Sequence, residues 1–149
     1  MKKKKFLLLQ ARKEKDPMIL HEKLCFQKQL KYQFNQLDSL DLIRDEIQIE
    51  KLERYDAFII GGSGDFSVAT GGPWFKKVCK IVKYLYNNNK VTFASCWGFQ
   101  LMAKAMGGEV KNNINQAELG TTKLWLTKQG EVDKIFKNLP LFFFCTDGA

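Results

Sequence analysis

The apolar positions in roughly the first hundred residues alternate between short continuous runs and longer segments with helical spacing. The continuous runs at residues 6–10 and 56–60 predict buried strands, and the β-branched and aromatic run at 91–94 predicts a further strand. The segments at 18–30 and 74–87 repeat apolar residues every three or four positions, which predicts helices. Strands and helices in this rhythm favour right-handed crossovers. We therefore expect a doubly wound α/β fold with a mostly parallel sheet.

The first predicted helix follows a polar connection. Pro17 suits its first turn, and Asp16 is a candidate N-cap. The pattern places five residues toward the sheet, namely Ile19, Leu20, Leu24, Cys25 and Phe26. A second strand is expected somewhere in residues 33–43, and one or two helical turns in 47–55.

The pattern changes after residue 108. Residues 109–118 are polar and loop-like, 121–127 alternate as an exposed strand, 132–139 suggest a short helix, and 141–145 form a last apolar strand. No internal repeat or low-complexity linker interrupts the chain. We therefore expect a single domain over residues 1–149.

The passage from strand to helix at Cys96 is the strongest chemical signal. Small residues, Ala94 and Gly98, stand two positions before and after this cysteine, as a sharp nucleophile elbow requires. At a helix N-terminus, the dipole and the free N–H groups favour the thiolate. Cys96 is therefore a candidate nucleophile; taken alone, it would more simply be a core cysteine.

A glycine loop, residues 61–64, follows the preceding strand of the predicted sheet. The carboxyl ends of parallel strands share an edge, so this loop and the N–H of Trp97 could together bind an oxyanion. The loop is not a Walker loop, and Ser67 stands where a dinucleotide fingerprint needs its third glycine. A four-residue RNA clamp of the GXXG type is a weak alternative, and a simple turn is another.

Composition narrows the class of protein. With 149 residues, 45% hydrophobic and 27% charged, the chain can build a core and does not read as disordered. The formal net charge of +8 is spread along the sequence, which disfavours a dedicated nucleic-acid face. The basic start and the apolar run that follows it are too short for an export signal or a membrane span, so we expect a cytoplasmic protein.

The four cysteines, at positions 25, 79, 96 and 145, form no metal-binding pattern and no obvious disulfide framework. We expect three of them to be buried thiols, and we expect no metal and no cofactor.

Residues 93–100, with the glycine loop at 61–65, resemble a class I glutamine amidotransferase of the stand-alone sort similar to the glutaminase domain of GMP synthase. Supporting landmarks occur at residues 8–12, 16–18, 21–22, 55–57 and 118–120. The resemblance implies a flavodoxin-like three-layer sandwich. It also implies glutamine or another γ-glutamyl compound as substrate, and a synthase partner that receives the ammonia.

The resemblance also implies residue roles. Cys96 would take the γ-glutamyl group as a thioester, and Gly62 and Trp97 would supply oxyanion N–H groups. The residues implied to bind or lie near the substrate are Gly61, Ser63, Gln100, Glu118 and Gly120. Without the resemblance, Gln100 reads as an exposed helix residue and Glu118 as an ordinary loop carboxylate.

The end of the chain departs from the family pattern. Such enzymes complete a Cys-His-Glu triad near the end of the domain, whereas the only histidine of this chain is His21. A family His-x-Asp landmark appears only as Cys145-Thr146-Asp147. We therefore expect a domain cut short or diverged there, with His21 either a substitute base or a surface residue. The alternative function is an inactive fragment or pseudoenzyme that binds a partner; a basic nucleic-acid binder ranks last.

Overall fold

The computed structural model describes residues 4–31, 37–116 and 120–147. The chain divides into two compact units, residues 1–111 and 112–149, and each is described by itself. The elbow and the glycine loop both lie in the first unit. The expectation of one amidotransferase-like domain over residues 1–149 stays a prediction.

The centre of the first unit is a four-stranded parallel sheet with the strand order β2-β1-β3-β4. Its strands are β1 (Phe6–Gln10), β2 (Leu37–Asp41), β3 (Ala57–Ile60) and β4 (Val91–Ala94). Its helices are α1 (Met18–Leu30), α2 (Ile49–Leu52), α3 (Phe75–Asn87) and α4 (Trp97–Ala105). The mostly parallel α/β fold expected from the sequence is confirmed.

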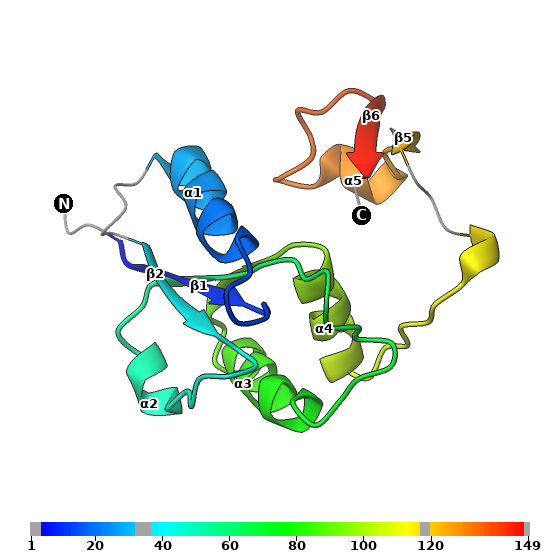
Figure 1. Cartoon of the computed structure of the whole chain (residues 1–149). Coiled ribbons are helices and arrows are strands. Elements are labelled where there is room, and N and C mark those ends of the chain that lie inside the picture. Colours follow the sequence, from blue (N-terminus) through cyan, green and yellow to red (C-terminus); the bar gives the residue numbers. More distant parts are fainter. Residues whose placement is uncertain (1–3, 32–36, 117–119, 148–149) are drawn as a thin grey trace. The chain divides into compact units, whose positions relative to one another are not determined.

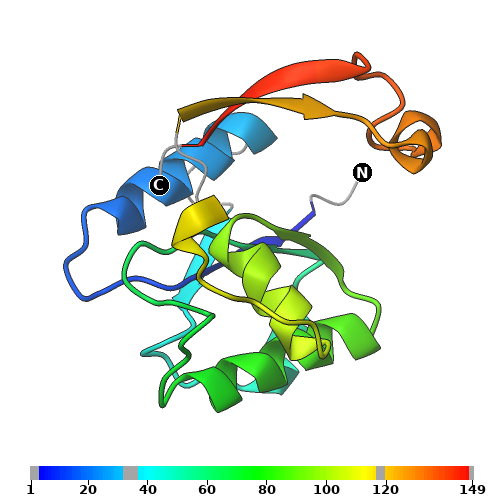
Figure 2. The same ribbon diagram turned by 90° about the vertical axis from the view of Figure 1, so that its right-hand side faces the viewer.

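Helices cover both faces of this sheet. Figures 1 and 2 show α1 on one side and α3 with α4 on the other. Because side chains alternate along a strand, Leu7 and Leu9 of β1 pack in the core on the α3 and α4 side, whereas Leu8 packs in a smaller cluster with Phe26 and Leu30 of α1. This is the layering of a doubly wound sandwich.

The predicted inner face of α1 is wrong in part. Leu20 and Leu24 are 54% and 47% exposed, and Cys25 is exposed as well. The buried residues of α1 are polar, Glu22 and Gln27. Glu22 has polar partners inside the fold, so the helix turns this carboxylate inward and leaves two leucines in solvent.

The start of α1 differs slightly from the prediction. Pro17, and not Asp16, occupies the N-cap position, and it makes no side-chain cap. Asp16 still accepts a hydrogen bond at 2.8 Å from the N–H of Met18, so its carboxylate binds one of the free amides of the first turn.

The second unit contains a two-stranded antiparallel sheet, β5 (Gly120–Trp125) with β6 (Phe142–Asp147), and a short helix, α5 (Lys128–Val132). A 3₁₀ turn spans Ile114–Gln116. The helix predicted at residues 132–139 is wrong. It forms earlier because the Thr127 hydroxyl caps it, accepting the Gly130 N–H at 3.1 Å.

All four cysteines are free thiols. Cys79 and Cys145 are half-buried, but Cys25 is exposed, so the expectation that Cys25 is buried is wrong. Within the described ranges, no helix combines the length and apolar character that crossing a membrane requires.

Candidate active site

The chain turns sharply from β4 into α4 at Cys96. Cys96 is the N-cap of α4 and adopts φ 49° and ψ −110°, a backbone conformation that suits glycine and strains other residues. Its side chain is exposed. The turn is closed by the N–H of Gly98, which donates to the carbonyls of Ser95 (2.8 Å) and Gly61 (3.1 Å). The structure thus presents a thiol at the carboxyl edge of the sheet.

Gly98 lets α4 approach the sheet closely. A Cβ at this position would lie 2.5 Å from the carbonyl oxygen of Ile60 and 2.8 Å from its Cγ2 atom. Both atoms belong to a buried strand, so they have little room to move. The small residue that the elbow pattern predicts after the cysteine is required by contact with β3.

The register of the sheet brings the glycine loop to Cys96. Ile60 and Ala94 are paired at the ends of β3 and β4, and the Ser95 N–H donates to the Ile60 carbonyl at 2.9 Å. A Cβ placed on Gly62 would lie 3.9 Å from the Cβ of Cys96. The structure therefore places Gly62 beside Cys96, as the topology predicts.

The two backbone amides expected to bind an oxyanion, those of Trp97 and Gly62, differ in their hydrogen bonding. The backbone N–H of Trp97 has no acceptor among the described residues. The N–H of Gly62 donates to Glu22 Oε1 at 2.8 Å. The elbow therefore offers one free amide, and a carboxylate binds the second.

Glu22 is a site residue whose role the sequence did not reveal. It is 8% exposed, and its carboxylate also accepts hydrogen bonds from Arg12 Nη2 (3.1 Å) and Gln10 Nε2 (2.9 Å). Carboxylates on amphipathic helices are usually exposed, and hydrophobic spacing alone does not mark this one as buried. The sequence feature that could have indicated a buried carboxylate is the pair of polar residues, Gln10 and Arg12, at the end of a buried strand, because both can donate hydrogen bonds.

The remaining predicted residues belong to the glycine loop, to α4 and to the second unit. Ser63 is half-buried, and its hydroxyl accepts the Phe66 N–H at 3.2 Å, which shapes the loop. Gln100 is exposed on α4, and Gly120 begins β5 in the second unit. Glu118 lies outside the described residues.

His21, the only histidine, is exposed on α1. Its Nε2 atom lies 3.5 Å from the Sγ atom of Cys25, one helical turn away. Within the described part of the chain, His21 makes no hydrogen bond to Cys96. The structure therefore pairs the imidazole with a different thiol.

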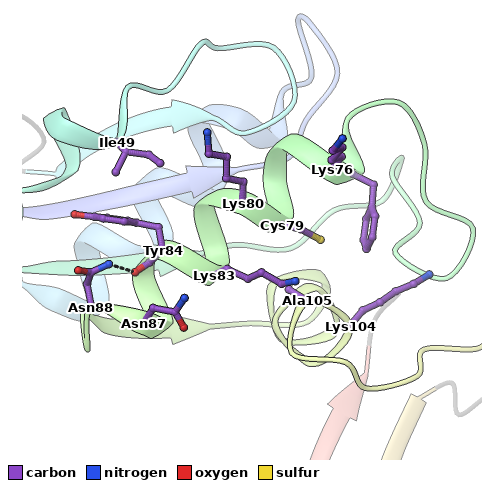
Figure 3. Close-up of a pocket in the computed structure, with 11 residues that line it drawn as sticks. Ile49, Lys76, Cys79, Lys80, Lys83, Tyr84, Asn87, Asn88, Lys104 and Ala105 are labelled. Carbon is purple, nitrogen blue, oxygen red and sulfur yellow. Dashed lines mark hydrogen bonds between the residues drawn. The ribbon is translucent and has the colours of Figure 1, made fainter.

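A separate groove of about 700 Å³ runs along α3 (Figure 3). Its rim carries four lysines, and no carboxylate is among the lining residues that the structure describes; the lysines are Lys76, Lys80, Lys83 and Lys104. Burial raises the pKa of the Cys79 thiol, which lines the same groove, and the nearby ammonium groups of Lys83 and Lys104 oppose that rise. None of the lining residues belongs to the elbow or to the glycine loop. The groove is therefore distinct from the Cys96 site.

Solved structures share this fold. A glutamine amidotransferase from Thermotoga maritima superposes with a TM-score of 0.68 at 19% identity, over 96% of this chain and 59% of that chain. A glutamine amidotransferase from Methylobacillus flagellatus gives a TM-score of 0.67 at 19% identity, over 98% of this chain and 55% of that one. At such low identity, these matches show the fold alone, and they confirm its flavodoxin-like class.

Curated relatives match by sequence. Gamma-glutamyl peptidase 4 of Arabidopsis thaliana is 35% identical over 95 residues, which is 63% of this chain and 38% of the relative. A glutamine-hydrolysing GMP synthase component of Sulfurisphaera tokodaii is 36% identical over 83 residues, 56% of this chain and 42% of the relative. The matches thus span less than half the length of either relative.

The family described as "Glutamine amidotransferase class-I" matches residues 22–143, which is most of the chain and includes the elbow and the glycine loop. The chain therefore belongs to the class I glutamine amidotransferases.

Proposed function

We propose that Cys96 is the nucleophile of a γ-glutamyl transfer reaction, with glutamine or another γ-glutamyl compound as donor. The observation that carries the proposal is the elbow itself. An exposed thiol stands at a helix N-terminus in a glycine-like backbone conformation, with a glycine loop beside it. The names of the relatives, a γ-glutamyl peptidase and a glutamine-hydrolysing GMP synthase, support a γ-glutamyl amide as substrate.

The reaction takes place in two steps. The sulfur of Cys96 forms a bond to the γ-carbonyl carbon, whose oxygen becomes negative and accepts the free N–H of Trp97. The C–N bond then breaks, and the amide nitrogen leaves as ammonia with the proton from the thiol. Water hydrolyses the thioester and releases glutamate, which restores the thiol. A synthase partner would receive the ammonia.

The chain's own side chains support the first step better than the second. A histidine usually shuttles the proton in such reactions, but His21 lies against Cys25 on α1. Loss of a general base typically costs about 10²- to 10⁴-fold in rate. We therefore expect acylation of Cys96 with slow turnover. Because turnover is expected to be slow, the experiments below also test the alternative, a binding protein derived from an enzyme.

The test of the nucleophile is covalent labelling. The folded protein is incubated with a chloroketone analogue of glutamine, and modified residues are located by mass spectrometry. We expect an adduct on Cys96 that forms faster than any on Cys25, which is also an exposed thiol without a disulfide. We also expect excess glutamine to slow the labelling of Cys96. The absence of an adduct on Cys96 would reject the active nucleophile.

Ammonia release separates an enzyme from a binding protein. The unmodified chain is compared with Cys96→Ala under identical conditions. Ammonia release is measured with glutamine, and release of the free amine is measured with a γ-glutamyl peptide, whose cleavage yields no ammonia. Faster release by the unmodified chain supports catalysis. Equal rates, together with labelling of Cys96 that glutamine slows, would support a binding protein instead.

A further inference from the structure

Glu22 connects three parts of the first unit beside the elbow. Its carboxylate accepts hydrogen bonds from Gln10 at the end of β1, from Arg12 in the loop after β1, and from Gly62 in the loop after β3. The side chain of Arg12 is buried as well, and its guanidinium also lies 3.8 Å from Asp16. A buried carboxylate that accepts three donors is a built feature of the fold.

The same carboxylate explains why residue 61 is glycine. A Cβ at Gly61 would lie 2.3 Å from Glu22 Oε1 and 2.7 Å from its carboxyl carbon. No side chain fits there while the carboxylate stays in place. The glycine loop is therefore shaped around Glu22 and not only around a substrate.

The bond from Gly62 to Glu22 has a direct consequence for an oxyanion hole. An N–H that points at Oε1 from 2.8 Å does not point at a substrate oxygen. The position of a Cβ on Gly62 is 3.9 Å from both Glu22 Oε1 and Cys96 Cβ. The carboxylate and an oxyanion formed at Cys96 would thus compete for the same amide.

We propose that Glu22 is a positioning residue that holds the Gly62 N–H in the free protein, so that the second oxyanion donor is supplied only when a substrate oxygen displaces the carboxylate. The inference rests on the proposed role of Cys96 as nucleophile. A hydrogen bond to a charged acceptor is stronger than one to a neutral acceptor. Replacing the carboxylate by an amide therefore makes the displacement easier.

The test compares two electrophiles on the full chain and on Glu22→Gln. In its ketone pathway, chloroacetone first takes up the sulfur at the carbonyl carbon, and the carbonyl oxygen becomes negative. The S–C bond to the methylene then forms as chloride leaves, the bond from sulfur to the carbonyl carbon breaks, and the C=O is restored. Iodoacetamide is displaced directly at its methylene, with loss of iodide. In both reactions the thiol proton goes to solvent. Only the first reaction uses oxyanion donors.

The expected result is a change in selectivity. In Glu22→Gln, the rate of Cys96 modification by chloroacetone, divided by the rate with iodoacetamide, rises about threefold to tenfold because the Gly62 N–H is held by a weaker bond. Iodoacetamide alone reacts at nearly the unmodified rate. A residue that only maintained the fold would change both rates together. An unchanged or lower ratio overturns the proposal.

Two further measurements test the proposal even if Glu22→Gln folds poorly. Gly61→Ala keeps Glu22 but forces its carboxylate out of contact, so the same rise in the ratio is expected. In the unmodified protein, hydrogen exchange of the Gly62 amide should be slow although the residue is only half-buried. Fast exchange at this amide overturns the proposal whatever the variants do.

The outcome is separable from the proposed function. Neither electrophile contains a glutamyl group, so the ratio reports only on the amide. If the glutamine chloroketone reacted with Cys96 no faster than chloroacetone, the γ-glutamyl specificity would fail. The proposal for Glu22 would still be decided by the ratio of the chloroacetone rate to the iodoacetamide rate and by hydrogen exchange of the Gly62 amide.

Discussion

At the level of single residues, the elbow depends on Gly98 having no side chain. Gly98→Ala places a methyl group 2.5 Å from the Ile60 carbonyl oxygen. Relief requires α4 to move away from the sheet, so we expect the free energy of unfolding to fall by about 1–3 kcal/mol. Urea unfolding followed by circular dichroism measures the change.

Gly64→Ala is the matched control for this prediction. A Cβ on Gly64 meets no atom within 4 Å, and its backbone does not adopt positive φ. We expect its unfolding free energy to stay within about 0.5 kcal/mol of the unmodified value. Equal effects of the two substitutions would show that the close packing of α4 on β3 is not what requires glycine at position 98.

Cys96 itself is strained, and this gives a second prediction. Because φ 49° and ψ −110° suit glycine, Cys96→Gly should be more stable than Cys96→Ala, by about 1 kcal/mol. Glycine in an ordinary helical or extended position would be the less stable of the two. Thermal unfolding of both variants measures the difference, and a more stable alanine variant would contradict the strain at the elbow.

The residues of the site were predictable to different degrees. The position of Cys96 and its closeness to Gly62 followed from the order of strands and from small residues near the cysteine. Glu22 was not predictable as a site residue, because a buried carboxylate depends on donors from other elements that no local pattern contains.

At the level of elements, Glu53 ties α2 to α3 and to the start of β4. Its carboxylate accepts hydrogen bonds from Lys90 (2.6 Å) and from the Tyr84 hydroxyl. The Lys90 hydrogen bond, followed by that of Tyr84, lowers the pKa of Glu53 below its usual range. A carboxyl group with a lower pKa in the folded state stabilises the fold above the pKa of the unfolded chain, and this contribution is lost as pH falls through the folded pKa.

Glu53→Gln therefore has an effect that depends on pH. The melting temperature should drop below that of the unmodified protein at about pH 6–7, and the difference should shrink toward zero as the pH falls below about 4. Scanning fluorimetry over this range measures it. Glu46→Gln is the control, since Glu46 is exposed and has no hydrogen bond or ion pair among the described residues. A difference that stayed constant with pH would contradict the ionic origin.

The elements show where sequence patterns are sufficient. Strands β1 and β3 occur where continuous apolar runs predicted buried strands, because a central parallel strand has to be apolar on both faces. Strand β4 also forms where the sequence predicted a strand, but it lies at the end of the sheet order, and its residues are exposed or half-buried. The inner face of α1 was mispredicted because hydrophobic spacing turns Leu20 and Leu24 toward the sheet. In the structure, the buried residues of this helix are Glu22 and Gln27. The helix α5 was missed because a local cap at Thr127, and not apolar periodicity, sets its start.

At the level of the whole first unit, one face of the sheet remains partly uncovered at β4. Val91 and Phe93 are 69% and 60% exposed at the end strand of the sheet order, and they border an apolar cavity of about 300 Å³ with Phe26, Leu30 and Ile59. An edge strand with an apolar face promotes association. We expect this chain to self-associate and to bind an apolar fluorescent dye.

Phe93→Ser tests that expectation. It should lower dye fluorescence and the average mass in sedimentation, while leaving the melting temperature nearly unchanged because the main core lies on the opposite face. Phe99→Ser is a control of equal chemistry, since Phe99 is 67% exposed on α4 but does not line this cavity. Equal effects of both substitutions would show a general loss of hydrophobicity and no specific face.

The all-parallel pairing of the sheet also bears on how the site forms. Residue 6 pairs with residue 57, and residue 57 pairs with residue 91, so each partner is distant in the sequence. Contacts of this kind close large loops and form slowly. Gly62 reaches Cys96 only after β3 and β4 have paired, so amide-assisted reactivity of the thiol should develop late in refolding. The rate at which a ketone electrophile modifies Cys96 at successive times of refolding would then report when β3 and β4 pair.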